Sequence, residues 1–155
     1  MHTEYFSQQG IEATIELLMQ RIQKKERGGF NAMLSPRLVR ADWEQKSCTL
    51  AFRAEEWMSN PVGIVHGGIL CAAADLSMGT LSIYLAQGGG ITPSVSISIN
   101  YLRAVPLGEE FFVTVTADHI GRRVNHLSCT IATASAPEVP CVTAIGTYYV
   151  SELSQ

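Results

Sequence analysis

The sequence is poor in charge and has no excess of positive charge. Charged residues make up 16% of the 155 positions, below the ~25% typical of globular domains. The 14 Asp and Glu residues outnumber the 11 Lys and Arg residues, so the formal net charge is -3. A general binder of nucleic acid or of an anionic membrane needs a basic face, and this composition argues against both classes. A lone monomer with so little charge would expose much apolar surface, which favours an oligomer.

Several sequence motifs are also missing. The four cysteines form no CxxC pair, and no Cys/His cluster has zinc spacing, so we expect reduced thiols and no metal site. No phosphate loop of the GxxxxGK[ST] or GxGxxG type and no GxSxG elbow is present. The first ten residues lack the basic start and apolar core of a secretory signal. We therefore expect a reducing, cytoplasmic location.

The length predicts one domain, with an N-terminal helix inside residues 1–29 and a core over residues 30–155. Four apolar residues recur at spacings of four, three and four, which predicts a helix over 11–27: Ile11, Ile15, Leu18 and Ile22. Gly28 and Gly29 are expected to stop this helix. We interpret it as a packing helix that carries no chemistry.

Residues 67–86 form an unusually apolar run in which Asp75 is the one charged residue. About 20 residues are enough to span a bilayer, so a membrane helix is one interpretation. An Asp in the middle of a span is costly, however, and the rest of the chain alternates like a soluble sheet. We interpret the run as a helix that is apolar on nearly all sides and therefore buried on nearly all sides.

Period-two alternation predicts strands on both sides of this run. Two strands are expected over residues 37–53. After a glycine-rich connection at 87–90, further strands begin with the alternating segment 94–101 and end with a strand over 142–150. Short turns between consecutive strands indicate antiparallel pairing. The predicted class is α+β: a curved antiparallel sheet of five to six strands wrapped around one long central helix.

Asp75 is the first candidate for chemistry. Burying an unpaired carboxylate is costly, so it must be paired, neutral or functional. The helix offers it no basic partner one turn away, at Cys71, Ala72, Met78 or Gly79. The residues alone leave a structural and a functional role open.

The segment NPVGIVHGG, residues 60–68, leads into the apolar helix and is the second candidate. The amides of Gly67 and Gly68 are expected at the helix N-terminus, where N–H groups are unpaired and the helix dipole is positive. Such a terminus can hold an anion or a developing oxyanion, and glycine allows a ligand to approach closely. Taken alone, the His-Gly-Gly turn is also compatible with His66 as a structural cap.

Together these residues resemble the hotdog-fold acyl-CoA thioesterases. The motif NPVGIVHGGI, followed by an Asp nine positions after the His, resembles in particular the PaaI-like (phenylacetic acid degradation) branch of the 4HBT thioesterase superfamily. SVSISINYLRA is similar to that family's third strand, and LGEEFFVTVTA, GRRV and AIGTY are similar to its later strands. The likeness covers about residues 30–150. It implies a hotdog fold, hydrolysis of an acyl-CoA to free acid and coenzyme A without a metal, and a homodimer that pairs further into a tetramer.

The resemblance also implies roles for individual residues. Asp75 corresponds to the catalytic carboxylate, acting as general base or nucleophile. Gly67 corresponds to the amide that polarises the thioester carbonyl, and Asn60 to a side chain that holds this carbonyl or the water. His66 matches a histidine that lines the site, and Ser94 a residue that orients the water. The resemblance further implies a site shared between two chains, in which Asp75 and Ser94 of one chain face Asn60, His66 and Gly67 of the other.

Coenzyme A enters as part of the substrate, so no cofactor is expected. Its phosphates need cationic contacts, and three arginines follow strand ends: Arg103, Arg122 and Arg123. Each of them is equally compatible with a solvated strand end. The amide of Gly68 is a further candidate for substrate binding. The acyl group stays open among aryl, phenylacetyl and medium-chain groups, with four candidate residues for its pocket: Met58, Met78, Ile83 and Tyr84.

Two rival functions remain open. A non-catalytic acyl-CoA-binding hotdog module would use the same fold, because function lies in the site and not in the scaffold. The carboxylate at Asp75 and the absence of an appended DNA-binding domain argue against it. A hotdog dehydratase or hydratase would need an Asp-His pair near the helix, whereas the adjacent pair Asp118-His119 is assigned to a distant strand.

Overall fold

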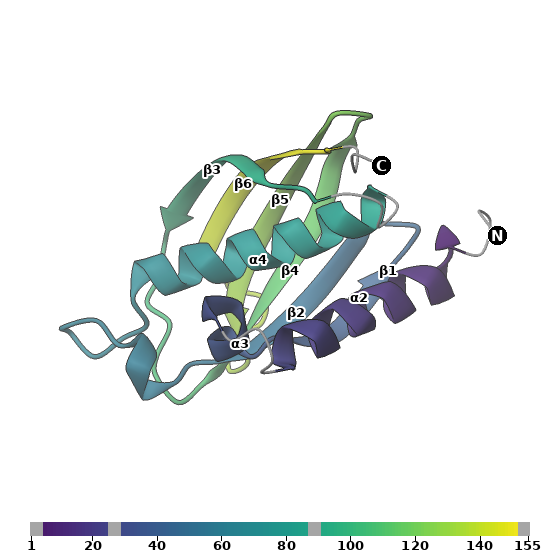
Figure 1. Cartoon of the computed structure of the whole chain (residues 1–155). Coiled ribbons are helices and arrows are strands. Elements are labelled where there is room, and N and C mark those ends of the chain that lie inside the picture. Colours follow the sequence, from purple (N-terminus) through teal and green to yellow (C-terminus); the bar gives the residue numbers. More distant parts are fainter. Residues whose placement is uncertain (1–4, 25–28, 87–90, 152–155) are drawn as a thin grey trace.

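The computed structural model describes residues 5–24, 29–86 and 91–151, so the predicted connection at 87–90 lies outside the described residues. Within them, six strands form one antiparallel sheet that curves around the long helix α4, Gly67–Leu85 (Figure 1). The strands are β1 (Arg37–Asp42), β2 (Ser47–Arg53), β3 (Ser94–Tyr101), β4 (Glu110–Ile120), β5 (Val124–Thr133) and β6 (Val142–Tyr149). This architecture confirms the predicted hotdog fold.

The position of β3 was not predicted. The sheet order is β1-β2-β4-β5-β6-β3, so β3 pairs with β6 and lies at the edge opposite β1. The chain reaches this edge because α4 lies between β2 and β3 in the sequence and crosses the sheet (Figure 1). Within the described residues, the outer side of β3 has no strand partner.

Burial accounts for the apolar composition of α4. By length and composition alone this helix could cross a membrane, but the sheet covers it along one side. Among its fully buried residues are Ala73, Ala74, Met78 and Leu81. Gly146 on β6 faces Met78 of the helix. A Cβ atom there would lie 2.8 Å from the Tyr148 ring and 3.1 Å from Cε of Met78, so a larger residue would force these side chains to move.

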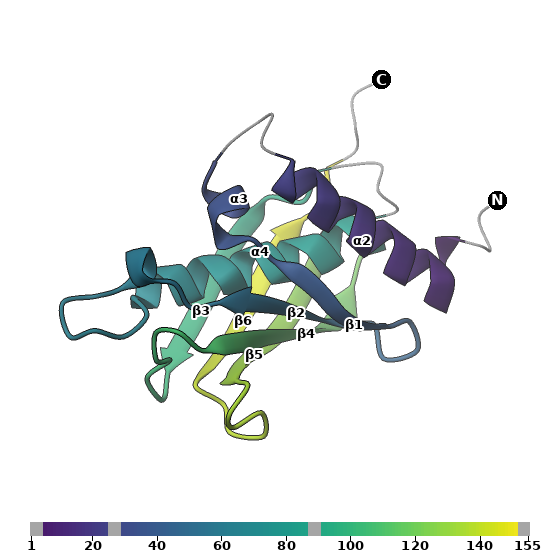
Figure 2. The same cartoon turned by 90° about the horizontal axis from the view of Figure 1, so that it is seen from below.

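Helix α2, Gln8–Gln23, packs beside α4 and differs from its prediction in two ways (Figure 2). It ends at Gln23 with Lys24 as the C-cap, before the predicted stop at Gly28-Gly29, and residues 25–28 lie outside the described residues. Its buried face is formed by Ile11, Ile15 and Met19. Leu18 and Ile22, expected on that face, are only half-buried and line a cavity against α4.

Two short elements were not predicted: helix α3, Phe30–Leu34, and the 3-10 turn η2, Glu56–Met58. Helix α3 follows α2 and lies close to its C-terminal end (Figure 2). The turn η2 leads into the segment that precedes α4. The turn η2 therefore lies beside a part of the chain singled out for chemistry, whereas α3 lies beside the helix predicted to have a packing role alone.

The four cysteines are free thiols. Burial raises the pKa of Cys48 to about 12, and burial together with neighbouring Cys71 does the same for Cys129. These two thiols stay protonated and unreactive near neutral pH. In the described part of the chain, no three His, Cys, Asp or Glu side chains gather closely enough to hold a metal ion.

Candidate active site

His66 forms the N-cap of α4. Its Nδ1 accepts a hydrogen bond from the Gly68 N–H at 2.9 Å, which places the imidazole proton on Nε2. Its backbone N–H donates to the Met58 carbonyl at 2.8 Å. The structure therefore shows His66 in the capping role that the sequence had left open. The Gly68 amide, predicted to bind substrate, donates its hydrogen bond to this cap instead.

The Gly67 amide is the one left unpaired at this helix end. No described residue accepts a hydrogen bond from its N–H, as expected for the first residue of a helix. Tyr101 lies beside Gly67. The Tyr101 hydroxyl donates to the Gly67 carbonyl at 2.9 Å, and a Cβ atom on residue 67 would lie 3.2 Å from the tyrosine ring. Tyr101 thus holds the backbone of Gly67 in place, a contact that the sequence analysis missed.

Asn60 shapes the loop that leads into α4. Its Oδ1 accepts hydrogen bonds from the backbone N–H groups of Val62 at 3.0 Å and Ile64 at 3.3 Å. No described residue accepts a hydrogen bond from its side-chain NH₂ group. The carbonyl end of this side chain is therefore structural, and the amino end remains available to a ligand.

Asn60 and Gly67 line a common cavity of about 380 Å³ together with Tyr101 and Arg103. Arg103 is the one predicted arginine that lines this cavity. Its Nη1 donates to the Pro140 carbonyl at 2.8 Å, which anchors the guanidinium and leaves its other N–H groups free to donate. We name this group of residues the amide half-site.

Asp75 lies half-buried in the middle of α4 and borders a different cavity, of about 480 Å³, which Ser94 and Tyr148 also line. The Tyr148 hydroxyl donates to Oδ1 of Asp75 at 2.9 Å. Burial and the negative charge of Asp75 raise the pKa of Tyr148, so its hydroxyl keeps its proton and remains a donor. The described residues form no ion pair with Asp75. We name this group the carboxylate half-site.

The position of Tyr148 could be predicted from the sequence only in part. The alternation of β6 places Ala144, Gly146 and Tyr148 on the face toward α4. The placement of α4 on the sheet decides which helix residue Tyr148 contacts. No pattern in the sequence predicts this placement.

The two half-sites of one chain are too far apart to act on one bond. Gly67 and Asp75 are eight residues apart on the same helix. A rise of 1.5 Å per residue separates them by about 12 Å along its axis. One carbonyl cannot lie within hydrogen-bonding distance of both groups. The grouping of Asp75 with Ser94, and of Gly67 with Asn60, is the one that the family resemblance implied for two different chains.

Other predicted residues lie outside both half-sites. Arg122 and Arg123 are exposed on the connection between β4 and β5, and neither lines the two cavities. Of the residues proposed for an acyl pocket, Ile83 lines the carboxylate cavity. The others are buried in the core instead: Met58, Met78 and Tyr84.

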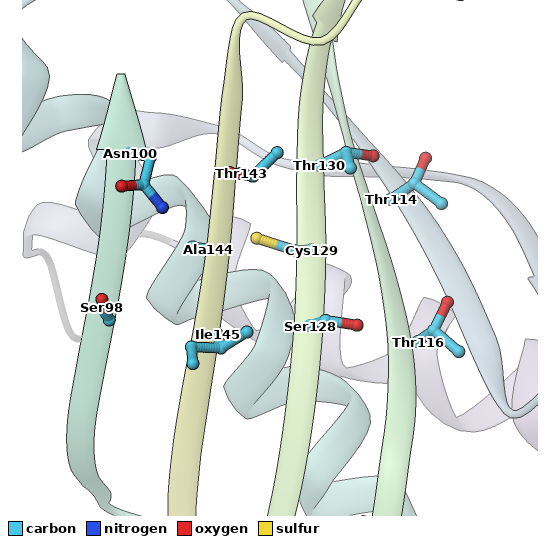
Figure 3. Close-up of a pocket in the computed structure, with 10 residues that line it drawn as sticks. All are labelled: Ser98, Asn100, Thr114, Thr116, Ser128, Cys129, Thr130, Thr143, Ala144 and Ile145. Carbon is cyan, nitrogen blue, oxygen red and sulfur yellow. The ribbon is translucent and has the colours of Figure 1, made fainter. Parts of the chain in front are cut away.

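A third hollow lies on the outer face of the sheet, away from α4 (Figure 3). Seven of its lining residues are serines, threonines and an asparagine: Ser98, Asn100, Thr114, Thr116, Ser128, Thr130 and Thr143. No carboxylate, imidazole or cation is among the described residues that line it. It therefore offers no base for hydrolysis, and the half-sites remain the candidates for chemistry.

Comparisons with known proteins agree with this architecture. Mouse acyl-coenzyme A thioesterase 13 is 31% identical over 87 residues, which are 56% of this chain and 60% of that protein, so the match spans less than two thirds of the relative. The crystal structure of zebrafish thioesterase superfamily member 2 has a TM-score of 0.77 at 19% identity and covers 90% of this chain and 97% of its own.

A phenylacetic acid degradation-related protein from Ralstonia eutropha JMP134 has a TM-score of 0.73 at 20% identity, covering 88% of this chain and 99% of its own. The zebrafish and Ralstonia structures both share the fold of this chain. The family model described as the thioesterase superfamily (4HBT) matches residues 62–139, half of the chain, and this range includes the start of α4, Asp75 and Ser94. The chain therefore belongs to the 4HBT thioesterase superfamily, whose PaaI-like branch its helix-entry motif resembles.

Proposed function

We propose that the protein is an acyl-CoA thioesterase. The observation that carries this proposal is Asp75, a carboxylate with no ion-pair partner among the described residues, held by Tyr148 at the wall of a cavity of about 480 Å³. Cavities of roughly 300–1,000 Å³ are typical of small-molecule sites. The name of the mouse relative supports a coenzyme A thioester as the substrate class.

In this mechanism Asp75 activates the attack on the thioester carbonyl. As a general base it removes a proton from a water molecule that Ser94 helps to orient, and the water oxygen forms the new bond to carbon. The tetrahedral intermediate then collapses, the C–S bond breaks, and the sulfur of coenzyme A leaves and takes up a proton. As a nucleophile, Asp75 would instead form an anhydride that water hydrolyses. Both routes give the same free acid and coenzyme A.

The amide half-site would stabilise the charge that develops on the carbonyl oxygen. The unpaired Gly67 N–H lies at the positive end of α4, and the NH₂ group of Asn60 lines the same cavity. Donors fixed in advance around a developing oxyanion lower the barrier without any cost of reorganisation. Coenzyme A is part of the substrate, and the mechanism uses no cofactor.

A second copy of the chain would bring the two half-sites together. Strand β3 is an edge strand of eight residues, and the exposed fractions of Val95 and Tyr101, near its two ends, are 64% and 51%. A long exposed edge invites pairing with another strand. In a two-fold dimer two β3 strands would pair antiparallel, so Ser94 of one copy would lie opposite Tyr101 of the other. Tyr101 contacts Gly67, and this pairing therefore directs each carboxylate half-site toward the partner's amide half-site.

We also propose a tetrameric assembly and a cytoplasmic location. The outer sheet face of Figure 3 would remain uncovered in such a dimer and is the surface that we propose for further pairing into a tetramer. Free, mostly buried thiols suit the reducing cytoplasmic location that we also propose.

The test is release of coenzyme A thiol from a panel of aryl, phenylacetyl and medium-chain acyl-CoAs. The proposed function predicts kcat/KM above about 10⁴ M⁻¹s⁻¹ for at least one member, the lower end of the ordinary enzyme range. Tight binding without hydrolysis across the panel would contradict it. That outcome would favour the non-catalytic acyl-CoA-binding module instead.

Replacing Tyr148 with Phe is expected to lower kcat roughly 10-fold and to change KM little, because the lost hydrogen bond orients the Asp75 carboxylate without binding substrate. Tyr148 is thus a positioning residue. The matched control is Tyr149→Phe, which removes the same hydroxyl from the next, partly exposed residue of β6. Steady-state kinetics of both variants provides the measurement, and equal kcat values in the two would contradict the assignment.

A further inference from the structure

Helix α2 does more than pack against the core. Leu18, Arg21 and Ile22 line the cavity that contains Asp75, and Asn31 of α3 joins them. The C-terminal end of α2 is anchored, because the side-chain amide of Gln23 donates to the Pro36 carbonyl at 2.7 Å. The wall that faces the carboxylate half-site is therefore a fixed part of the fold.

A second space adjoins this cavity. A neighbouring groove of about 330 Å³ is also lined by Arg21, Ile22 and Asn31, and it adds Lys24. The two spaces share three lining residues, so they adjoin each other, and we name the two together the path between α2 and α3. Figures 1 and 2 show α2 beside α4, with α3 close to the C-terminal end of α2.

The two ends of this path differ in charge. The carboxylate of Asp75 lies at the inner end, and the outer end has the cations of Arg21 and Lys24. No Asp or Glu is among the described residues that line the outer groove, and the described part of the chain offers no hydrogen-bond or ion-pair partner to the Arg21 guanidinium. Among the described residues, this local positive charge has no ion-pair partner, although the chain as a whole has a net charge of -3.

The stretch between the two ends is apolar. Leu18 and Ile22 of α2 face Leu76 and Ile83 of α4 across the cavity, and all four are half-buried. A ligand that fills the path would have a reacting group near Asp75, an apolar segment, and an anion at its far end. Guanidinium groups bind carboxylate and phosphate through paired, charge-assisted hydrogen bonds.

We propose that Arg21, assisted by Lys24 and Asn31, binds an anionic group of the thioester substrate. This inference rests on the proposed thioesterase function. The anion is either a carboxylate at the far end of the acyl group or a phosphate of coenzyme A, since both present the same charged oxygens. The site lies on the helix that the sequence analysis interpreted as packing alone, and away from Arg122 and Arg123.

The test compares wild-type protein with Arg21→Gln on four substrates: hexanoyl-CoA, adipoyl-CoA, and the N-acetylcysteamine thioesters of the same two acids. If the anion is a coenzyme A phosphate, KM rises roughly 10-fold for both CoA thioesters and stays constant for the N-acetylcysteamine thioesters. If the anion is the acyl carboxylate, the rise is confined to the two adipoyl thioesters. A KM that is unchanged for all four substrates overturns the proposal.

The matched control is Arg53→Gln, which removes one positive charge from an exposed residue at the end of β2 that lines neither cavity. It should leave every KM unchanged. If the wild-type protein hydrolyses none of the substrates, the proposed function fails by itself. Titration calorimetry with free coenzyme A and with adipate then tests the groove directly. Binding that Arg21→Gln weakens supports the site, and binding that is equal in both proteins, or absent, overturns it.

Discussion

Replacing Asp75 with Asn is expected to lower kcat by roughly 10²- to 10⁴-fold, the contribution typical of a positioned general base. The side chain of Asn has nearly the same size and can still accept the Tyr148 hydrogen bond through its amide oxygen. It cannot take a proton from water or attack a carbonyl. The fold should therefore survive while the chemistry is lost, and thiol release under saturating substrate measures the effect.

Asp118→Asn is the matched control for this experiment. Asp118 is an exposed carboxylate on β4 that accepts a hydrogen bond from Ser128, and it borders neither half-site. Its substitution removes the same charge from the same kind of side chain and should leave kcat unchanged. An Asp75→Asn protein that melts like the wild type and turns over at the wild-type rate would eliminate Asp75 as base or nucleophile.

The main features of the fold could be predicted because they depend on local patterns. An almost uncharged run of helical length around Asp75 has to be surrounded by other elements, and period-two alternation supplies a sheet to surround it. The order of the strands could not be predicted in the same way. Pairing of β3 with β6 follows from the path of α4 across the sheet, and alternation is the same whichever neighbour a strand has.

The residues of the candidate site likewise fall into those that the sequence could predict and those that it could not. Asp75 and Gly67 stand out because each conflicts with its local surroundings, one as a charge in an apolar helix and the other as an unpaired amide at a helix start. No such conflict marks Tyr148, Tyr101 or Arg21, because each fits the pattern of its own strand or helix. They join the half-sites through contacts between distant parts of the chain, and those contacts exist only after folding.

Replacing Gly67 with Pro is expected to lower kcat roughly 10²- to 10³-fold, the usual effect of removing one oxyanion donor. Proline deletes the N–H and adds a ring at this position. It is favoured at the first residue of a helix, where that N–H has no partner. The preceding residue, His66, already has φ -61° and ψ 135°, the extended conformation that a following proline requires.

Gly67→Ala separates the loss of the donor from the added bulk. Both variants place a Cβ atom about where it would meet the Tyr101 ring at 3.2 Å, and that partly exposed ring can shift by the few tenths of an ångström required. Only the alanine variant keeps the N–H. We expect Gly67→Ala to retain most of the activity, measured as thiol release beside Gly67→Pro. Similar losses in the two variants would assign the effect to crowding at Tyr101 and not to the amide.

Mixing the two inactive proteins tests whether the half-sites belong to different chains. Co-expressed Asp75→Asn and Gly67→Pro chains would form mixed dimers in which the intact carboxylate of one chain faces the intact amide of the other. Each mixed dimer then contains one complete site and one doubly defective site. Random pairing restores about a quarter of the wild-type activity per chain, because half of the dimers are mixed and half of their sites work. If each chain carried a complete site of its own, every site in the mixture would lack one group, and the activity would stay at the level of the two parents.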